Sequence, residues 1–430
     1  MTDDVPVERV LRPLHTTTWK FLALLVLLGL GMLLFLEAWI TQLRNGLIMT
    51  GLGDWGTGGG VPWGMYIGSF IWWVGIAHGG IAVSAAVRVF KMDQFEPIAR
   101  IGEIVTLVAL PMAAANIVFD LGGPDRLINT MIMWPQTVHH SPLAWDVAVV
   151  SLYLVLSMTY LTLTMRAELY ALMDRVPRYL RPVYGLLLLG YRPEEDEKAE
   201  QMAYWLAIAI LALVPLLSGG VVPWLFSLVG AQPGWFGAAT GPAMLFESLA
   251  SAIAFVIVVG AAFRYAYDWE FIDDAVFRGL TKALTVLSMA VLWFLLHDTL
   301  SGVYAAPVQD EALTETLLTM PLFWVAVAGI TIPALYMLAT IVRPSAYSLP
   351  AVVAGAISVS IAIWIKKLIF VVEGLLYPTT PPLANLYPTG SYSPTAIEWV
   401  VVVSTVVIAA LLIALATKII PMVELDPEEI

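Results

Sequence analysis

The sequence has no cysteine, few histidines and little charge. Its 430 residues include 5 His and no Cys, and 13% of them are charged against 60% that are hydrophobic. Without cysteine the chain forms no disulfide and offers no thiolate to zinc, to an iron–sulfur cluster or to a c-type haem. Soluble domains carry about 25% charged residues, so this composition excludes a soluble enzyme. The net charge of −12 leaves no basic face for nucleic acid.

Long apolar runs fill most of the chain instead, and the mean hydropathy is +0.83. A membrane helix needs about 20 mainly apolar residues. Ten runs meet that length, and we expect membrane spans at residues 19–42, 63–88, 100–120, 142–165, 203–228, 242–264, 280–304, 317–341, 348–376 and 396–420. The sequence therefore predicts an all-α integral membrane protein with about ten transmembrane helices.

The distribution of Lys and Arg among the connections predicts the orientation of these spans. If the N-terminus is placed on one side, 17 of the 21 Lys and Arg residues fall on that side, whereas only Arg44 and Arg126 fall on the other. The remaining two, Lys366 and Lys367, lie within the ninth span. Cytoplasmic connections carry the excess of Lys and Arg. We therefore expect both termini in the cytoplasm and the chain in the cytoplasmic (inner) membrane.

The connections predicted on the outer side are rich in Gly, Pro and aromatic residues and carry few charges. They comprise residues 51–62, 120–142, 229–241 and 377–394. Apolar surfaces of this kind mark interaction sites. We interpret them as docking surfaces for an extracytoplasmic partner, with packing of the loops against one another as the alternative.

Twelve ionisable side chains fall within the spans or at their ends. Such groups are costly in lipid, so each is a functional candidate. We expect eight in the outer third of the membrane: Glu37, Asp120, Asp146, Glu247, His297, Asp298, Glu373 and Glu398. His78 is expected near the midplane, Glu103 near the inner face, and Lys366 and Lys367 at mid-membrane, where both lysines need partners.

Two functions fit this layout. One is an outer-face pocket for a quinone, whose protons pass through carboxylates and His. The other is a proton or ion pathway without redox chemistry. At each position a structural role, such as a carboxylate that reaches the interface from a helix end, is a further alternative. Because only His78 and His297 lie within spans, and at different depths, a membrane haem with paired His ligands is not expected.

Three segments in the first half of the chain carry a specific pattern. They are Trp63 with Tyr66, the segment DLGGPDR at 120–126, and Ser141-Pro142 followed by Trp145-Asp146. This pattern resembles the NrfD/PsrC family, the membrane subunits of polysulfide-reductase-like quinone oxidoreductases. The GIAHGG motif around His78, with Glu103 following, resembles the long branch of that family. The family usually has Arg at the position of Gly123. The ten spans resemble its long branch, which includes the membrane subunits of alternative complex III and of the Dsr and Qrc complexes.

The resemblance implies an architecture and a set of partners. Spans two to five and six to nine would form two four-helix bundles flanked by the first and last helices, which divides the chain at 1–50, 51–228, 229–376 and 377–430. Menaquinone or ubiquinone would bind near the outer face as substrate, with no haem and no iron–sulfur cluster in this chain. The implied partners are a ferredoxin-like iron–sulfur subunit on the outer loops, a molybdopterin-type subunit or cytochrome c subunits, and membrane lipid.

Roles for particular residues follow from the resemblance and from the chemistry of a quinol, which must pass its protons to a group within hydrogen-bond reach. We expect Asp146 to be that base, with His139 or His140 in reserve. His78 and Glu103 are expected to form an inner half-path for protons. Residues expected at the quinone or at the neighbouring outer loop are Trp63, Tyr66, Asp120, Arg126 and Trp145. No metal site is expected, and a proton channel or transporter without redox chemistry remains the alternative function.

Overall fold

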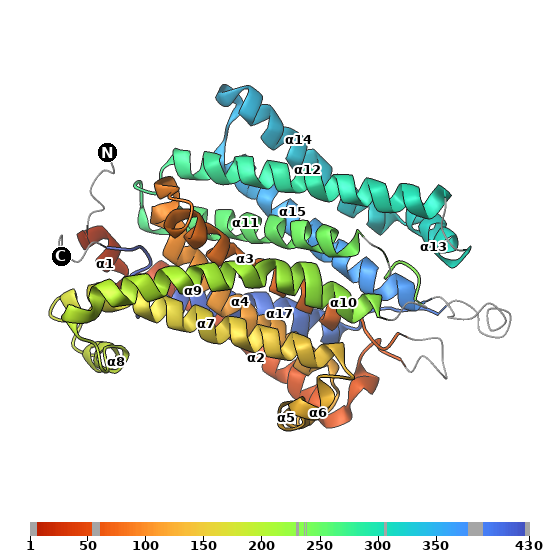
Figure 1. The fold of residues 1–430 in the computed structure, drawn as a ribbon, viewed down its shortest axis with the longest axis horizontal. Helices are drawn as coiled ribbons and strands as arrows, with labels where there is room; N and C mark the ends of the chain where they lie inside the picture. Colours follow the sequence, from red (N-terminus) through yellow and green to blue (C-terminus); the bar gives the residue numbers. More distant parts are fainter. Residues whose placement is uncertain are drawn as a thin grey trace.

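The structure of the chain is a computed structural model that describes residues 7–53, 61–228, 232–235, 237, 239–304, 308–376 and 390–425. Every regular element within these residues is a helix (Figure 1). Much of three outer connections predicted to dock a partner, namely residues 54–60, 229–231 and 377–389, lies outside the described residues.

Ten helices in the described part of the chain are long and apolar enough to cross a membrane. They are α2 (Trp19–Asn45), α3 (Met65–Arg88), α4 (Glu96–Asp120), α7 (Pro142–Ala171), α9 (Asp196–Leu216), α11 (Thr240–Tyr267), α12 (Asp274–Tyr304), α14 (Pro321–Val342), α15 (Leu349–Leu375) and α17 (Ala396–Ala416). The span that starts with α9 continues through a π-helical turn, η4 (Leu217–Val221), into α10 (Val222–Ser227). The predicted fold class and the predicted number of spans are confirmed.

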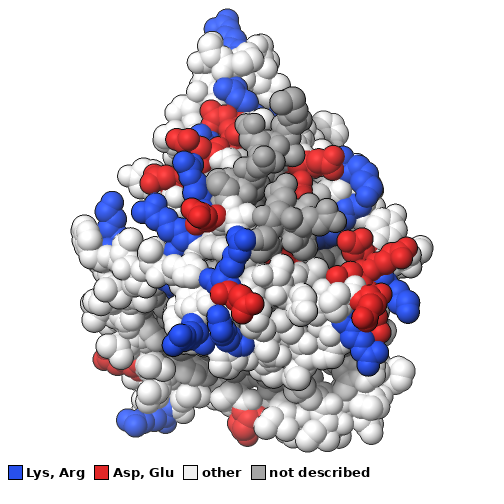
Figure 2. All heavy atoms as spheres, turned by 90° about the vertical axis from the view of Figure 1, so that its left-hand side faces the viewer, with Lys and Arg blue, Asp and Glu red and all other residues white. Residues whose placement is uncertain are grey.

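Shorter elements lie at the ends of the long helices. They are α1 (Val7–His15), η1 (Leu47–Met49), η2 (Asp93–Phe95), α5 (Arg126–Ile132), α6 (Trp134–Thr137), α8 (Arg181–Leu187), η3 (Pro193–Glu195), α13 (Val308–Thr319) and η5 (Pro344–Ala346). In Figure 1, α1 and α8 lie at one end of the molecule, α13 lies at the opposite end, and α5 and α6 lie at the bottom of the view, next to the start of α7. We call the end with α1 and α8 the inner end and the end with α13 the outer end, after the predicted orientation. Charged side chains of both signs gather on the inner end (Figure 2).

Local sequence explains where several spans begin. Pro142 and Pro321 occupy the first positions of α7 and α14, directly after residues with extended backbone, because proline has no N–H to leave unpaired there. Helix α17 starts with a capping box, in which Thr395 and Glu398 bond each other's backbone N–H groups. These signals fix the outer ends of α7, α14 and α17.

Helix α3 occupies the centre of the molecule. In its most apolar stretch 83% of the residues are buried, against 11% in α2, which lies at the periphery beside α17. Helix α3 packs against α4 so closely that a Cβ atom built on Gly80 would lie 1.8 Å from the carbonyl oxygen of Gly102. Glycine at this crossing therefore sets the α3–α4 distance.

Two groups of helices share α3 as a common wall. Helices α3, α4, α7 and α9 pack against one another, and we call them the first helix group. Helices α11, α12, α14 and α15 do the same and form the second helix group. Because α3 also packs against α11 and α15, polar groups in the two helix groups are separated by little more than one helix.

Candidate functional site

Helix α7 carries three polar side chains at intervals of seven residues, namely Asp146, Tyr153 and Tyr160. Seven residues are about two helical turns, or about 10.5 Å of rise, so these side chains share one face. All three are buried, with no exposed surface. The face they form crosses the first helix group from its outer end toward its inner end, and we call it, together with the polar groups of α3, α4 and η4 described below, the α7 ladder.

Asp146 stands at the outer end of the ladder. Its side chain is fully buried, and neither carboxylate oxygen has a hydrogen-bond partner among the described residues. Buried polar atoms in folded proteins are nearly always bonded, so an exception requires an explanation. A carboxyl group left alone inside a membrane protein is a candidate to take up a proton or to bond a polar ligand.

An apolar groove of about 420 Å³ lies next to Asp146 along α7, but its lining consists of neighbouring residues and does not include Asp146 itself. Trp145, directly before Asp146, and Val149, one turn after it, form one wall, and Trp224 of α10 faces them. The Trp145 indole donates a hydrogen bond to the carbonyl of Val138 (2.8 Å), which fixes the ring at the end of the outer loop. Gly220 and Val221 of the π-helical turn η4, with Leu216 at the end of α9, complete the groove. Turns of this kind are frequent at functional positions.

His78 occupies the middle of the ladder. It is buried on α3, and its Nε2 lies 2.6 Å from the Ser218 hydroxyl of η4. Its Nδ1 lies 3.4 Å from the Tyr153 hydroxyl, which also donates to the carbonyl of Ala77 at 3.2 Å. The imidazole therefore connects the π turn that lines the groove with the second residue of the ladder.

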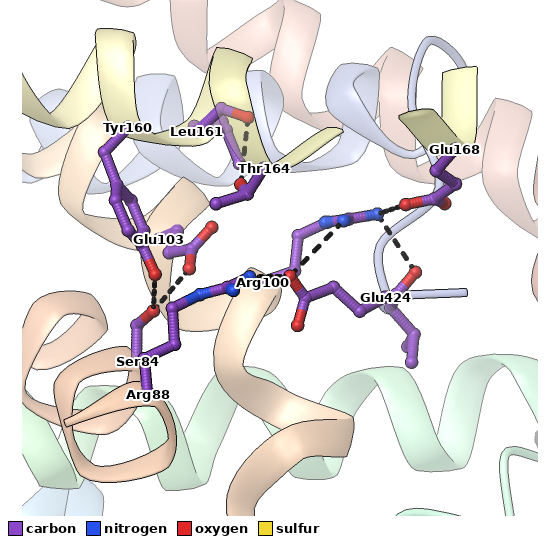
Figure 3. A network of polar contacts seen from close by, with 10 residues as sticks. Ser84, Arg88, Arg100, Glu103, Tyr160, Leu161, Thr164, Glu168 and Glu424 are labelled. Atoms are coloured by element: carbon purple, nitrogen blue, oxygen red, sulfur yellow. Dashed lines mark hydrogen bonds and ion pairs between the residues drawn. The ribbon is translucent and has the colours of Figure 1, made fainter. Parts of the chain in front are cut away.

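Glu103 joins the ladder one level further in, and Figure 3 shows this network. Ser84 donates to Glu103 Oε1 at 2.6 Å, and the Tyr160 and Ser84 hydroxyls are also 2.6 Å apart. Since the serine proton is already given to the carboxylate, Tyr160 is the donor to Ser84. Of the predicted inner pair, His78 therefore contacts Tyr153 directly, whereas Glu103 is joined to Tyr160 through Ser84.

The network ends in buried ion pairs at the inner end. Arg100 donates to Glu168 of α7 at 2.5 Å, and both side chains are almost fully buried (Figure 3). Glu424, after α17, pairs with Arg88 and lies 3.8 Å from Arg100. The chain beyond the last span therefore closes the inner side of the first helix group.

These inner residues were not predicted from the sequence as functional. Arg88 and Arg100 served only as markers of orientation, and Tyr153 and Tyr160 carried no prediction. The seven-residue spacing from Asp146 was the available signal for the two tyrosines. Glu424 lies on the short segment after α17 and gave no signal of its own.

Trp63 and Tyr66 are held in packed aromatic clusters. Tyr66 donates to Gln42 at 2.5 Å, and Gln42 donates in turn to the carbonyl of Phe119 at 2.8 Å. Trp63 stacks on Trp235 with ring centroids 5.7 Å apart. Neither residue lines the groove beside Asp146, so their expected contact with a quinone ring stays a prediction.

Polar contacts fix the outer end of α17 next to Tyr66. Glu398 accepts hydrogen bonds from the backbone N–H of Gly51 (2.6 Å) and from the Tyr392 hydroxyl (2.6 Å). Burial, together with the neighbouring Glu398 carboxylate, raises the pKa of Tyr392, so this hydroxyl stays protonated and remains a donor. Asp120 lies nearby at the end of α4, and its Oδ1 is buried without a partner among the described residues.

The remaining predicted residues lie on the outer loop between α4 and α7. Arg126 begins α5 and is exposed, as are His139 and His140 after α6. The same loop exposes large apolar side chains: Ile128 (59% exposed), Met131 (63%), Ile132 (71%) and Met133 (51%). The loop therefore presents apolar surface beside exposed basic and titratable groups.

The lysines predicted to need partners have one. Glu247 of α11 receives Lys366 on one oxygen at 2.5 Å and Lys367 on the other. Glu247 and Lys366 line a cavity of about 490 Å³ in the second helix group, which His297, Asp298 and Glu373 also line. Five of the ionisable groups identified from the sequence thus meet at one cavity.

Comparison with known proteins identifies the family. The pattern of the family described as polysulphide reductase, NrfD, matches residues 55–379 of this chain. The chain belongs to the NrfD family. That match covers both helix groups, whereas the sequence resemblance was strongest over residues 55–165.

Several curated proteins are similar to this NrfD chain over nearly its whole length. A protein of Halobacterium salinarum assigned as a membrane subunit of dimethyl sulfoxide reductase is 27% identical over 95% of this chain and 91% of its own. A selenate reductase subunit of Mesobacillus selenatarsenatis is 25% identical over 96% and 95%. The Hdr-like menaquinol oxidoreductase integral membrane subunit of Archaeoglobus fulgidus is 22% identical over 93% of each chain. All three relatives are named as subunits of oxidoreductases, and those of Halobacterium and Archaeoglobus as membrane subunits, in line with the class of complex that the sequence predicts for this chain.

Proposed function

We propose that this NrfD-family chain is the quinone-reactive membrane subunit of an oxidoreductase complex. It exchanges electrons and protons between a membrane quinone near the outer end and an iron–sulfur subunit docked there. The observation that carries the proposal is the buried, unpartnered carboxyl group of Asp146, which lies between Trp145 and Val149, two residues that line an apolar groove. A quinol releases two protons as it gives up two electrons, so its oxidation requires a proton acceptor within hydrogen-bond reach.

The groove and Asp146 suit the two parts of a quinone. The groove has apolar walls that suit an isoprenoid chain and the face of a ring. These walls are Trp145, Val149, Leu216, Gly220, Val221 and Trp224. Asp146 supplies the polar group at which a quinol hydroxyl loses its proton. His139 and His140, exposed on the preceding loop, are the reserve acceptors.

The electrons leave through another chain. The sequence has no cysteine, so the ligands of an iron–sulfur cluster come from a partner subunit. The exposed apolar residues of α5 and α6, with Arg126 beside them, are the proposed docking surface. A molybdopterin-type subunit or cytochrome c subunits complete the complex, in line with the reductase and menaquinol oxidoreductase names of the relatives.

The α7 ladder is the proposed proton route between Asp146 and the inner end. Its groups form two hydrogen-bonded clusters, one of Ser218, His78 and Tyr153 and the other of Tyr160, Ser84 and Glu103. Successive ladder residues are separated by about 10.5 Å along the helix, which is longer than one hydrogen bond. We propose that more than one water molecule bridges each of these gaps during proton transfer. Quinone chemistry at the outer end is then coupled to proton movement across the membrane.

The substitution Asp146→Asn tests the base. It keeps the shape of the side chain and removes the proton acceptor, so we expect quinol oxidation by the complete complex to fall by about 100-fold or more, the usual contribution of a positioned acid or base. The matched control is Asp174→Asn, whose side chain is 96% exposed in the inner loop. Unchanged quinol oxidation in Asp146→Asn would remove this residue from the mechanism.

A further inference from the structure

The second helix group encloses the cavity of about 490 Å³, which is separate from the groove beside Asp146. Helices α11, α12, α14 and α15 form its walls, and α13 covers its outer end. Most of its lining is apolar, including Leu295, Phe323, Val327, Ile330, Ile369 and Phe370. Cavities of about 300–1,000 Å³ with apolar walls and a few convergent polar groups are typical of small-molecule sites.

The polar part of the cavity combines one lysine, Lys366, with the carboxyl groups of Glu247, Asp298, Asp310 and Glu373. Lys366 and Lys367 share the single carboxylate of Glu247, and only Lys366 faces the cavity. An ammonium group has three donors, and Glu247 accepts one from Lys366. Buried charge is favourable only when its remaining donors are bonded as well. Lys366 is therefore equipped to donate to an oxygen atom of a ligand.

The mouth of the cavity lies at the outer end of α12. His297, Asp298 and Ser301 belong to the lining and are also exposed. Their neighbours Leu296 and Leu300 are 52% and 48% exposed, as expected of side chains that face lipid. A ligand that enters here passes between polar groups and an apolar surface, which suits an amphipathic ring molecule better than a hydrated ion.

We propose that this cavity is a second binding site for a quinone-class ring. Lys366 donates to one ring oxygen, Phe323 and Phe370 border the ring, and the carboxyl group of Glu373 lies within the same cavity for the second oxygen. The inference rests on the proposed function, because it assumes that the chain serves quinones, and it adds a site that does not involve Asp146.

Two lysine substitutions separate ligand binding from folding. Both Lys366→Met and Lys367→Met leave one lysine paired with Glu247, so each retains one buried ion pair. Only Lys366 lines the cavity. We expect Lys366→Met to weaken binding at the second site by about tenfold or more, whereas Lys367→Met leaves it within about threefold; each tenfold change corresponds to about 1.4 kcal/mol.

A second pair of variants changes the volume of the cavity. Val327 lines the cavity, whereas Val325, on the same helix, is 55% exposed outside it. We expect Val327→Phe to occupy the space of the ring and Val325→Phe to have no effect. Retention of the partner subunits and the melting temperature of each purified complex show that the variants are folded.

The measurement is the stoichiometry of the fluorescent quinol analogue 2-heptyl-4-hydroxyquinoline N-oxide, titrated against the purified, quinone-depleted complex. We expect two molecules bound per chain in the native protein, one in Val327→Phe, and quinol oxidation retained in that variant. If the Val327→Phe chain still binds two molecules of the analogue, the second site is not in this cavity. The same follows if the native chain binds one molecule and neither Lys366→Met nor Val327→Phe changes its affinity. Either result would overturn the second site alone. Absence of binding in every protein would overturn the proposed function as well.

Discussion

Glu247 is the residue on which two buried lysines depend. Lys367 and Glu247 are almost fully buried, and Lys366 is 17% exposed. Removing one partner of a buried ion pair leaves an uncompensated charge, and Glu247 is the carboxylate that both lysines contact. The residue therefore has a structural role that is separate from any ligand in the adjoining cavity.

We predict that Glu247→Gln destabilises the protein by about 3–5 kcal/mol, the cost of breaking a buried ion pair. Thermal unfolding of the purified complex, followed by tryptophan fluorescence, measures the loss. Glu311→Gln, at an exposed position on α13, is the matched control and should unfold like the native protein. Equal melting temperatures for the two variants would show that the lysines find other partners.

Among the individual side chains, the sequence predicted some contacts and missed others. That Lys366 and Lys367 need a partner follows from their depth alone, and Glu247 is that partner. Tyr66 and Trp63 were predicted to lie at a quinone, and that prediction is untested. Their contacts with Gln42 and Trp235 were not predicted, and these contacts join residues far apart in the chain. No local pattern reveals such contacts, because they depend on how the helices cross.

The crossing of α3 and α4 brings two helix backbones into direct contact. A Cβ atom at Gly80 would lie 1.8 Å from the Gly102 carbonyl oxygen, and a backbone atom cannot move aside as a side chain does. His78 and Ser84 on α3, and Glu103 on α4, are aligned by the same contact. The position of the inner part of the ladder therefore depends on two glycines.

We predict that Gly80→Ala separates α3 from α4, lowers the yield of assembled complex and reduces its melting temperature by several degrees. Gly185→Ala is the matched control, because an added Cβ there meets nothing within 4 Å. Size-exclusion chromatography with a thermal scan measures both effects. A Gly80→Ala complex as stable as the control would mean that the helices are not in contact at this glycine.

For the helices themselves, sequence alone was a reliable guide. Ten apolar runs became ten helices, because the length of apolar sequence needed to cross a membrane is a local property. The π-helical turn η4 was not predicted, although Gly219 and Gly220 with the flanking Pro215 and Pro223 lie around it. Glycine and proline are common in membrane helices, so their presence did not single out this turn, and the groove that η4 lines was missed.

Taken as a whole, the molecule has polar groups in both helix groups and one central helix, α3, between them. The sequence located most of the ionisable residues of the 490 Å³ cavity one by one. Their convergence on one cavity was not predictable, because it depends on the mutual rotation of α11, α12 and α15. The family resemblance did not help here either, since its specific motifs lie in the first helix group.

The proposed coupling of quinone chemistry to proton movement predicts a difference between two glutamate variants. We expect Glu103→Gln to interrupt the ladder and to lower the number of protons moved per electron in proteoliposomes. Glu194→Gln, exposed at the inner end, should keep the native ratio. The ratio is followed with a pH-sensitive dye during quinol oxidation. An unchanged ratio in Glu103→Gln would place the proton route elsewhere.

The quinone content of the purified complex, with its partner subunits attached, tests the central proposal most directly. A lipid extract with quantified quinone, taken together with a haem-sensitive optical spectrum of this chain, gives the answer. We predict bound quinone and no b-haem signal from this chain. An extract without quinone from an intact complex would contradict a quinone-reactive subunit and favour a proton pathway without redox chemistry.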